Sequence, residues 1–236
     1  MKDRDIDDIL KRAAEAQRDV DAAVLNRIAG SINATLRPVR PLPSSSTLVT
    51  GLISIAATVA VAGAMILGPH GIQKMNALEI GLIFPVLGVL VWVASVLCVA
   101  EAIPGSERPM TPATLAVTGC VGLGIVFGLL FHDYGTERFV SQGRACLIAG
   151  LVHAVPTYIA TWWLLSRGFA VDPIAAGLAK GILAGLAGVV MLELHCANFE
   201  APHVIVWHIA VIPVSGAFGS LAEWTRARGP RRSAAG

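Results

Sequence analysis

Three histidines, a cysteine and two carboxylates lie within one short segment of this sequence, between apolar runs long enough to cross a bilayer. The segment runs from residue 191 to residue 208, and its reactive side chains are Glu193, His195, Cys196, Glu200, His203 and His208. Thiolate and imidazole groups are the soft and borderline ligands that suit zinc, copper and heavy metals. A charged side chain at the bilayer centre costs about 2.5 to 3.5 kcal/mol on insertion scales, so such groups near a membrane indicate a function.

The composition is that of an integral membrane protein. Of the 236 residues, 55% are hydrophobic and only 14% are charged, whereas about 25% of residues are charged in soluble domains. Runs of about 20 apolar residues predict six transmembrane helices, at residues 48–67, 78–100, 112–131, 146–165, 174–194 and 204–222. None of the six runs alternates apolar and polar residues as a membrane β-strand does. The predicted fold class is therefore all-α: a polytopic membrane protein with six transmembrane helices and a short cytoplasmic helical N-terminal segment.

These boundaries divide the chain into three regions. Residues 1–47 form a polar head with an amphipathic helix and a proline-rich linker, residues 48–222 form the six-helix transmembrane domain, and residues 223–236 form a basic tail. Charged residues are spread through the first 43 positions, so we expect no cleaved signal peptide.

The basic residues predict which side of the protein faces the cytoplasm, because loops rich in Lys and Arg stay there. With six spans both termini lie on one side, and of the 18 basic residues only Lys74, Arg138 and Arg144 fall on the other side. Lys180 lies inside the fifth span, near enough to its cytoplasmic end to snorkel there. We therefore predict a multi-pass protein of the bacterial inner membrane, embedded in the lipid bilayer, with both termini in the cytoplasm.

This orientation places Cys146 and Cys196 at the outer face, together with all six histidines. The outer face of a bacterial inner membrane is oxidising, so the two cysteines can form a disulfide if their Cα atoms approach to about 4.4 to 6.8 Å. The same thiols can instead bind a metal ion with neighbouring groups, of which the candidate ligands are His153, Glu193, His195, His203 and His208. We therefore expect a redox or metal-sensing role for the two cysteines, with a transient metal ion as the one candidate cofactor.

Each of these side chains also has a plainer interpretation. An interfacial histidine often does no more than hydrogen-bond to the backbone or to a nearby carboxylate such as Glu193. Cys98 and Cys120 fall in the inner halves of their spans, where a cysteine is usually an inert small apolar residue.

The apolar residues of the head recur at helical spacing. Val20, Val24, Ile28 and Ile32 follow one another four residues apart, so they share one face of an amphipathic helix. Charges of both signs surround this face, which argues against a pure lipid anchor. The helix therefore either lies on the membrane surface or a neighbouring helix, or docks into the groove of a soluble protein. The predicted partner-binding residues are Ile6, Leu10, Val20, Val24, Ile28 and Ile32.

Several function classes find no support in the sequence. It contains no nucleophile elbow, Walker loop or metalloprotease helix, so we expect a protein that is not an enzyme. The pI near 8.5 reflects mixed charges in the polar head, and we expect no direct binding of nucleic acid.

The order of these features resembles the NrsF family, six-span anti-sigma factors of the bacterial inner membrane. The resemblance extends from about residue 38 to residue 221 and is carried by Pro38-Val-Arg-Pro-Leu-Pro43, Cys146-Leu-Ile, Leu194-His195-Cys196, and the block from His203 to His208 that includes Trp207. It implies that the N-terminal segment, roughly Asp5 to Leu36, holds a cytoplasmic sigma factor of the extracytoplasmic-function class. It also implies that Cys146 and Cys196 sense stress.

The leading hypothesis is therefore a membrane-bound anti-sigma factor that releases its sigma factor on redox or metal stress. The alternative from another class is a small metal- or haem-handling membrane transporter or redox protein. A third interpretation is a structural membrane subunit whose polar block contacts another protein.

Overall fold

The computed structural model describes residues 8–9, 11–12, 22–35 and 42–228. The chain divides into two compact units, Met1–Pro41 and Leu42–Gly236. The predicted partner-binding residues Ile6, Leu10 and Val20 lie outside the described residues.

The first unit contains helix α2 (Ala22–Thr35), in the region where the spacing of apolar residues predicts an amphipathic helix. Val24, Leu25, Ile28 and Ile32 are all exposed. Successive residues of an α-helix are turned by about 100°, so these four side chains share one side of α2. Asn26 lies on the opposite side of the helix and is also exposed.

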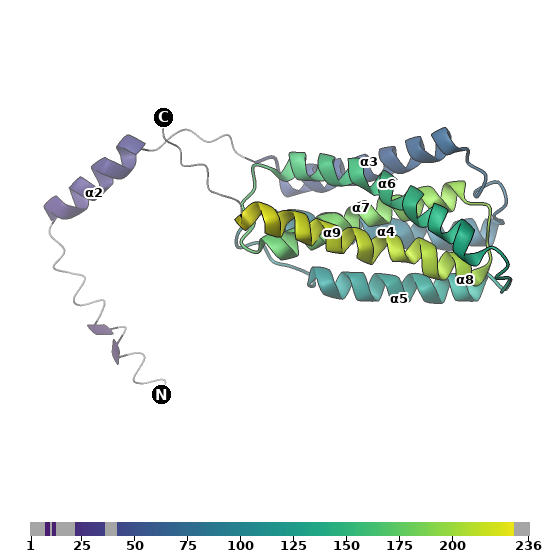
Figure 1. The fold of residues 1–236 in the computed structure, drawn as a ribbon. Coiled ribbons are helices and arrows are strands. Elements are labelled where there is room, and N and C mark those ends of the chain that lie inside the picture. Colours follow the sequence, from purple (N-terminus) through teal and green to yellow (C-terminus); the bar gives the residue numbers. More distant parts are fainter. Residues whose placement is uncertain (1–7, 10, 13–21, 36–41, 229–236) are drawn as a thin grey trace. The chain divides into compact units, whose positions relative to one another are not determined.

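The second unit is a bundle of helices, and six of its segments are long and apolar enough to cross a membrane (Figure 1). The helices are α3 (Ser45–Leu67), α4 (Ala77–Ala102), α5 (Pro112–Leu130), α6 (Phe139–Leu165), α7 (Pro173–His195), α8 (Ala201–His203), η2 (Val204–His208) and α9 (Ile209–Arg228). The last three run on continuously as one span-capable segment. Across the described residues there is no strand, only an isolated bridge between Asp133 and Glu200. The structure therefore confirms the all-α, six-span fold class.

Side-chain caps explain where several of these helices begin. The side chains of Ser44, Asn76, Thr111 and Asp172 each accept hydrogen bonds from backbone N–H groups in the first turn of α3, α4, α5 and α7. At α4 the cap is reciprocal, because Glu79 accepts a hydrogen bond from the backbone N–H of Asn76. Caps of this kind satisfy backbone donors that have no partner within the helix.

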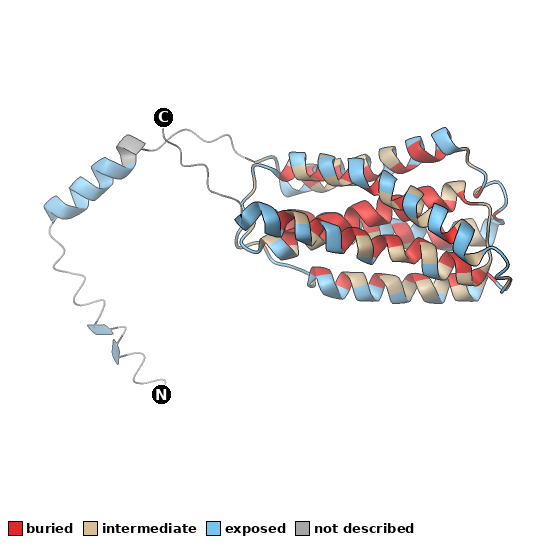
Figure 2. Ribbon diagram, in the orientation of Figure 1, coloured by how far each residue is buried: buried red, intermediate tan, exposed pale blue. Residues whose placement is uncertain are grey.

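Helix α7 is the centre of the bundle, and it contacts α3, α4, α5, α6 and α9. In Figure 2 it is coloured as buried along most of its length. A Cβ added at Gly177 or Gly181 would lie 2.4 or 2.3 Å from a backbone oxygen of α9. The glycines of this span therefore allow close helix packing.

Two helix boundaries differ by more than three residues from those predicted by hydropathy. Helix α6 begins at Phe139 rather than at residue 146, because its first turns carry polar groups such as Gln142 that bond to a neighbouring loop. Cys146 therefore lies inside α6. Helix α9 continues to Arg228 instead of ending at residue 222, because Glu223 is buried and forms ion pairs within the bundle.

Candidate functional site

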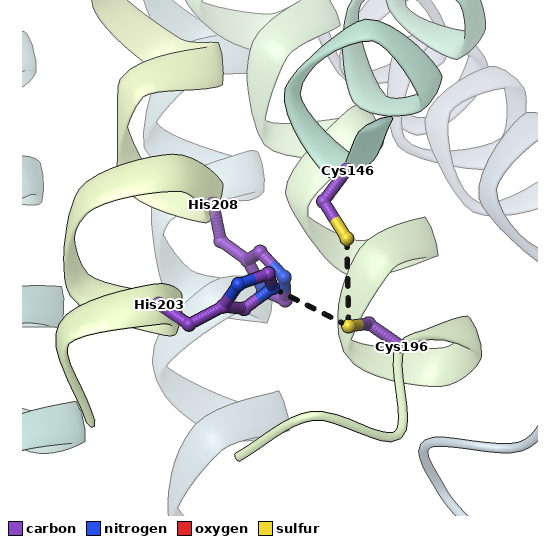
Figure 3. A group of neighbouring side chains, drawn as sticks. All are labelled: Cys146, Cys196, His203 and His208. Atoms are coloured by element: carbon purple, nitrogen blue, oxygen red, sulfur yellow. Dashed lines mark hydrogen bonds between the residues drawn. The ribbon is translucent and has the colours of Figure 1, made fainter. Parts of the chain in front are cut away.

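Four side chains meet at the end of the bundle where α6 begins and α7 ends, and we call them the thiol–imidazole cluster: Cys146, Cys196, His203 and His208 (Figure 3). The Sγ atoms of the two cysteines are 3.5 Å apart. The Sγ atom of Cys196 is 3.6 Å from Nε2 of His203. One donor atom from each of the four residues lies within 4.8 Å of all the others. The cluster joins Cys146 of α6 to a segment that begins fifty residues later, from Cys196 to His208.

The two histidines face the same point because the chain between them is a π-helix. His203 and His208 are five positions apart, and in an α-helix this spacing would turn them about 140° away from each other. The wider turn of η2, from Val204 to His208, brings their rings to a centroid distance of 5.2 Å. Single π-helical turns occur frequently at functional sites.

Close packing against α6 holds η2 in place. A Cβ added at Gly143 would fall 2.0 Å from Nε1 of Trp207, so the indole ring lies directly on the α6 backbone. The ring of Phe139 packs against the same indole at 5.5 Å. A glycine in the first turns of α6 therefore allows the helix that carries the histidines to approach Cys146.

Cys196 is held by the loop that connects α7 to α8. Its backbone N–H donates to the carbonyl oxygen of Leu192 at a distance of 2.7 Å, and this hydrogen bond is the last of α7. Further along the loop, the amide of Asn198 donates to Gln142 of α6 at 2.7 Å, and the ring of Phe199 stacks on Phe131. These contacts fix the thiol of Cys196 relative to α6.

A buried carboxylate orients one of the histidines. Nδ1 of His208 lies 2.7 Å from Oε1 of Glu193, and both side chains are fully buried. Among the described residues, Nε2 of His208 and Nδ1 of His203 have no hydrogen-bond partner. Buried polar atoms of a native protein are normally paired, so these two nitrogens mark the cluster as a site with unused binding capacity.

The surroundings of Cys196 favour its thiolate form. The hydrogen bond from the Cys146 thiol is the largest influence and lowers the pKa of Cys196 below its ordinary value. The rings of His203 and His208 lower it further, while burial opposes them. A thiolate is the form of cysteine that attacks oxidants and binds metal ions.

A cleft of about 450 Å³ adjoins the cluster from the loop side. It is lined by Asp133, Glu137, Arg138, Gln142, Ala197, Asn198, Phe199 and Glu200. Ala197 directly follows Cys196, and Gln142 lies one helical turn before Cys146. The cleft is therefore lined by residues that neighbour both cysteines in the chain.

Two of the candidate metal ligands lie apart from the cluster. Nδ1 of His195 is 2.8 Å from the carbonyl oxygen of Gly68, and its ring faces His70. Nδ1 of His153 is 2.8 Å from the carbonyl oxygen of Ala149 in its own helix. Both rings are bonded to backbone, as in the plainer interpretation of these histidines. Glu193 reaches the cluster only through His208.

A second polar group, which sequence reasoning missed, lies at the opposite end of α7 and α9. Lys180 of α7 is buried and donates to Glu223 of α9. Arg226 also pairs with Glu223, at 3.3 Å, and its guanidinium lies over the ring of Trp162. Lys180 inside the fifth apolar run and Glu223 directly after the sixth are the signal that could have predicted this pair, because buried charges require partners.

Comparison with known proteins links this arrangement to one family. The sequence model of the family described as "NrsF: Negative regulator of sigma F" matches residues 33–228. A protein of Azospira oryzae, named "Probable anti-sigma-F factor NrsF", is 25% identical over 171 residues, which cover 68% of this chain and 80% of that protein. No solved structure matches the chain. The family match includes the whole thiol–imidazole cluster and begins near the end of α2.

Proposed function

The chain belongs to the NrsF family of negative regulators, and on this premise we propose that it holds a sigma factor of the extracytoplasmic-function class at the bacterial inner membrane. Release follows when a stress signal changes the thiol–imidazole cluster. The observation that carries the proposal is the family match across the entire six-span domain. A regulator of this kind acts by binding and has no catalytic step of its own.

The proposed orientation has both termini in the cytoplasm and the cluster at the outer face. It is supported by the basic residues in the described part of the bundle, residues 42–228, of which only Lys74, Arg138 and Arg144 belong to loops or helix ends on the cluster side. The sigma factor and the signal are then on opposite sides of the membrane, so the transmembrane helices must connect them.

Helix α2 is the proposed sigma-binding element. Val24, Leu25 and Ile28 are exposed on one side of it, and an apolar helix face of this kind fits a hydrophobic groove on a soluble protein. The flanking residues Asn26 and Arg27 keep the opposite side polar. Val24, Leu25 and Ile28 precede the start of the family match at residue 33, so this part of α2 can fit a partner particular to this chain.

Oxidation of the two thiols is the proposed release step. Cys146 and Cys196 each lose a proton, and together they give two electrons to a peroxide or another two-electron oxidant, which is reduced. The Sγ atoms must then approach from 3.5 Å to the bond length of about 2.05 Å. This movement pulls α6 and the end of α7 together and changes the contact of Cys196 with His203.

The experiment that tests sequestration compares two substitutions on α2. Ile28→Asp places a charge in the apolar face, whereas Asn26→Asp places the same charge on the opposite, polar side. The tagged full-length chain is captured from membranes of unstressed cells, and the co-purified proteins are identified by mass spectrometry. We expect a sigma factor with the unmodified chain and with Asn26→Asp, and a large loss of it with Ile28→Asp.

Two results would contradict the proposal. Absence of a sigma factor from repeated captures of the unmodified chain would remove the anti-sigma function and favour the transporter or redox alternative. Equal capture by Ile28→Asp and Asn26→Asp would show that the apolar face of α2 is not the binding surface.

A further inference from the structure

The spacing of the thiol–imidazole cluster matches that of a tetrahedral metal site. Zinc binds thiolate sulfur at about 2.3 Å and imidazole nitrogen at about 2.0 to 2.1 Å, so tetrahedral geometry separates two sulfurs by about 3.8 Å and a sulfur from a nitrogen by about 3.6 Å. The corresponding distances here are 3.5 Å between the two Sγ atoms and 3.6 Å between Cys196 and His203. All four donors already lie within 4.8 Å of one another, so only a small contraction is needed.

The surroundings of the cluster are also those of a metal site. A histidine that binds a metal usually gives its other ring N–H to a carboxylate, which fixes the tautomer and the direction of the ring. Glu193 makes this contact with Nδ1 of His208, and within the described part of the chain Nε2 of that ring has no partner. Cys196, His203 and His208 are buried while Cys146 is partly exposed, which leaves an approach for an ion.

We propose that the cluster binds one zinc-class divalent ion through Cys146, Cys196, His203 and His208, with Glu193 as the residue that positions His208. Two sulfurs and two nitrogens in a tetrahedral arrangement select zinc or cadmium over magnesium and calcium, which prefer oxygen ligands. Binding releases the thiol protons and involves no electron transfer.

A bound ion gives the cluster a structural role as well as a chemical one. Its ligands come from α6, from the end of α7, and from α8 and η2, so the ion ties these segments together at one end of the bundle. In the context of the proposed function, on which this consequence rests, the ion occupies the cluster in the unstressed protein, and formation of the disulfide, rather than loss of the ion alone, releases the sigma factor. An oxidant that converts the two thiolates to a disulfide accepts two electrons and displaces the ion as free Zn²⁺.

Metal content of the purified full-length chain tests this site directly. The protein is prepared in detergent under reducing conditions, loaded with Zn²⁺ and freed of excess metal. Its zinc content is then measured by elemental mass spectrometry. A parallel sample is loaded with Co²⁺, whose visible spectrum reports tetrahedral coordination and thiolate ligation. We expect about one ion per chain and a thiolate charge-transfer band.

Substitutions in the cluster are compared with substitutions of neighbouring histidines. Cys196→Ser and His208→Asn are expected to lose the bound ion, whereas His195→Asn and His153→Asn, outside the cluster, are expected to keep it. Glu193→Gln leaves all four ligands in place and is expected to weaken zinc affinity about 10- to 100-fold. Because this last variant preserves side-chain size, it tests positioning even if a ligand variant fails to fold.

The possible outcomes separate the metal site from the anti-sigma function. The proposed metal site would be refuted if the unmodified chain held no stoichiometric zinc. It would also be refuted if a folded double variant, Cys196→Ser with His208→Asn, still bound zinc. Unchanged zinc affinity in Glu193→Gln would overturn the role of Glu193. A chain that binds zinc but captures no sigma factor would retain the site and refute the proposed function instead.

Discussion

At the scale of single residues, the two cysteines of the cluster have different surroundings. Cys196 is buried at the end of α7, next to both the Cys146 thiol and the ring of His203. Cys146 is partly exposed within α6. Two neighbouring thiols, one of them in surroundings that favour its thiolate, form an arrangement in which a disulfide can form reversibly in response to oxidants. Both residues are therefore required for the proposed switch, Cys196 as the buried thiolate and Cys146 as the partly exposed thiol beside it.

The first prediction at this scale is that Cys146→Ser or Cys196→Ser abolishes release by oxidants. The protein is expected to hold its sigma factor without stress, but a sigma-dependent reporter should lose its induction by a thiol oxidant. A coupling of about 1 to 3 kcal/mol between two sites corresponds to an effect of about 5- to 150-fold, and this is the induction expected to disappear. Mobility on non-reducing gels reports the Cys146–Cys196 disulfide in the unmodified protein.

The matched control is the double substitution Cys98→Ser, Cys120→Ser. These two thiols lie outside the cluster, so the control removes two other sulfur atoms without altering the proposed switch. Normal induction is expected. Induction that survives in Cys146→Ser and Cys196→Ser would refute the thiol mechanism.

The reactive residues could be identified from the sequence, but their arrangement could not. His195 stands next to Cys196 and looked as suitable a ligand as His203. Adjacent residues at a helix end point in directions about 100° apart, and His195 is turned toward Gly68. The pairing of His203 with His208 depends on a π-helical turn, for which the sequence pattern offered no signal.

At the scale of helices, the contact between α7 and α9 is the closest in the bundle. The glycines of α7 lie against the α9 backbone, where the backbone oxygen of Ser215 is 2.3 Å from the position of a Cβ at Gly181. No side chain separates the two helices there. A displacement of one helix must therefore be accompanied by movement of the other, because a close-packed interface cannot absorb it.

We therefore predict that Gly181→Val destabilises the bundle. The added side chain overlaps the backbone of α9, and overpacking of a close-packed interior costs about 1 to 3 kcal/mol. Gly122→Val in α5 is the matched control, since none of the described residues has an atom within 4 Å of a Cβ at that position. Thermal unfolding in detergent should show a clear loss of stability for Gly181→Val alone. Equal melting temperatures for the two variants would contradict this account of the interface.

Hydropathy predicted all six helices because length and apolar composition are what a bilayer requires of a span. It misplaced the start of α6 and the end of the last span because polar residues there continue the helix, bonded to other parts of the bundle. Gln142 bonds to Asn198, and Glu223 bonds to Lys180. An average of hydropathy over a window of residues does not detect such tertiary contacts.

At the scale of the whole bundle, α7 and the segment that ends in α9 carry polar groups at both ends. Glu193 and Cys196 belong to the cluster end of α7, and His208 stands just before α9. Lys180 and Glu223 join the same two helices at the other end. In the proposed orientation one polar group faces the signal and the other faces the cytoplasm. The α7–α9 pair is thus a direct physical connection between the cluster and the side where the sigma factor is proposed to be held.

The prediction for this connection is that Glu223→Gln raises sigma-dependent transcription in unstressed cells. Removing one partner of a buried ion pair costs about 3 to 5 kcal/mol because the other charge remains buried. In Glu223→Gln the charge left buried is that of Lys180. If the ion pair holds the resting packing of α7 on α9, its loss should mimic the signal, and an oxidant should add little further induction. Glu107→Gln, in the exposed loop between α4 and α5, is the control for loss of one carboxylate. Immunoblots must show that the Glu223→Gln protein is present, and its zinc content must show that the cluster is intact. Low basal transcription with full induction in that protein would exclude the α7–α9 pair as the route of the signal.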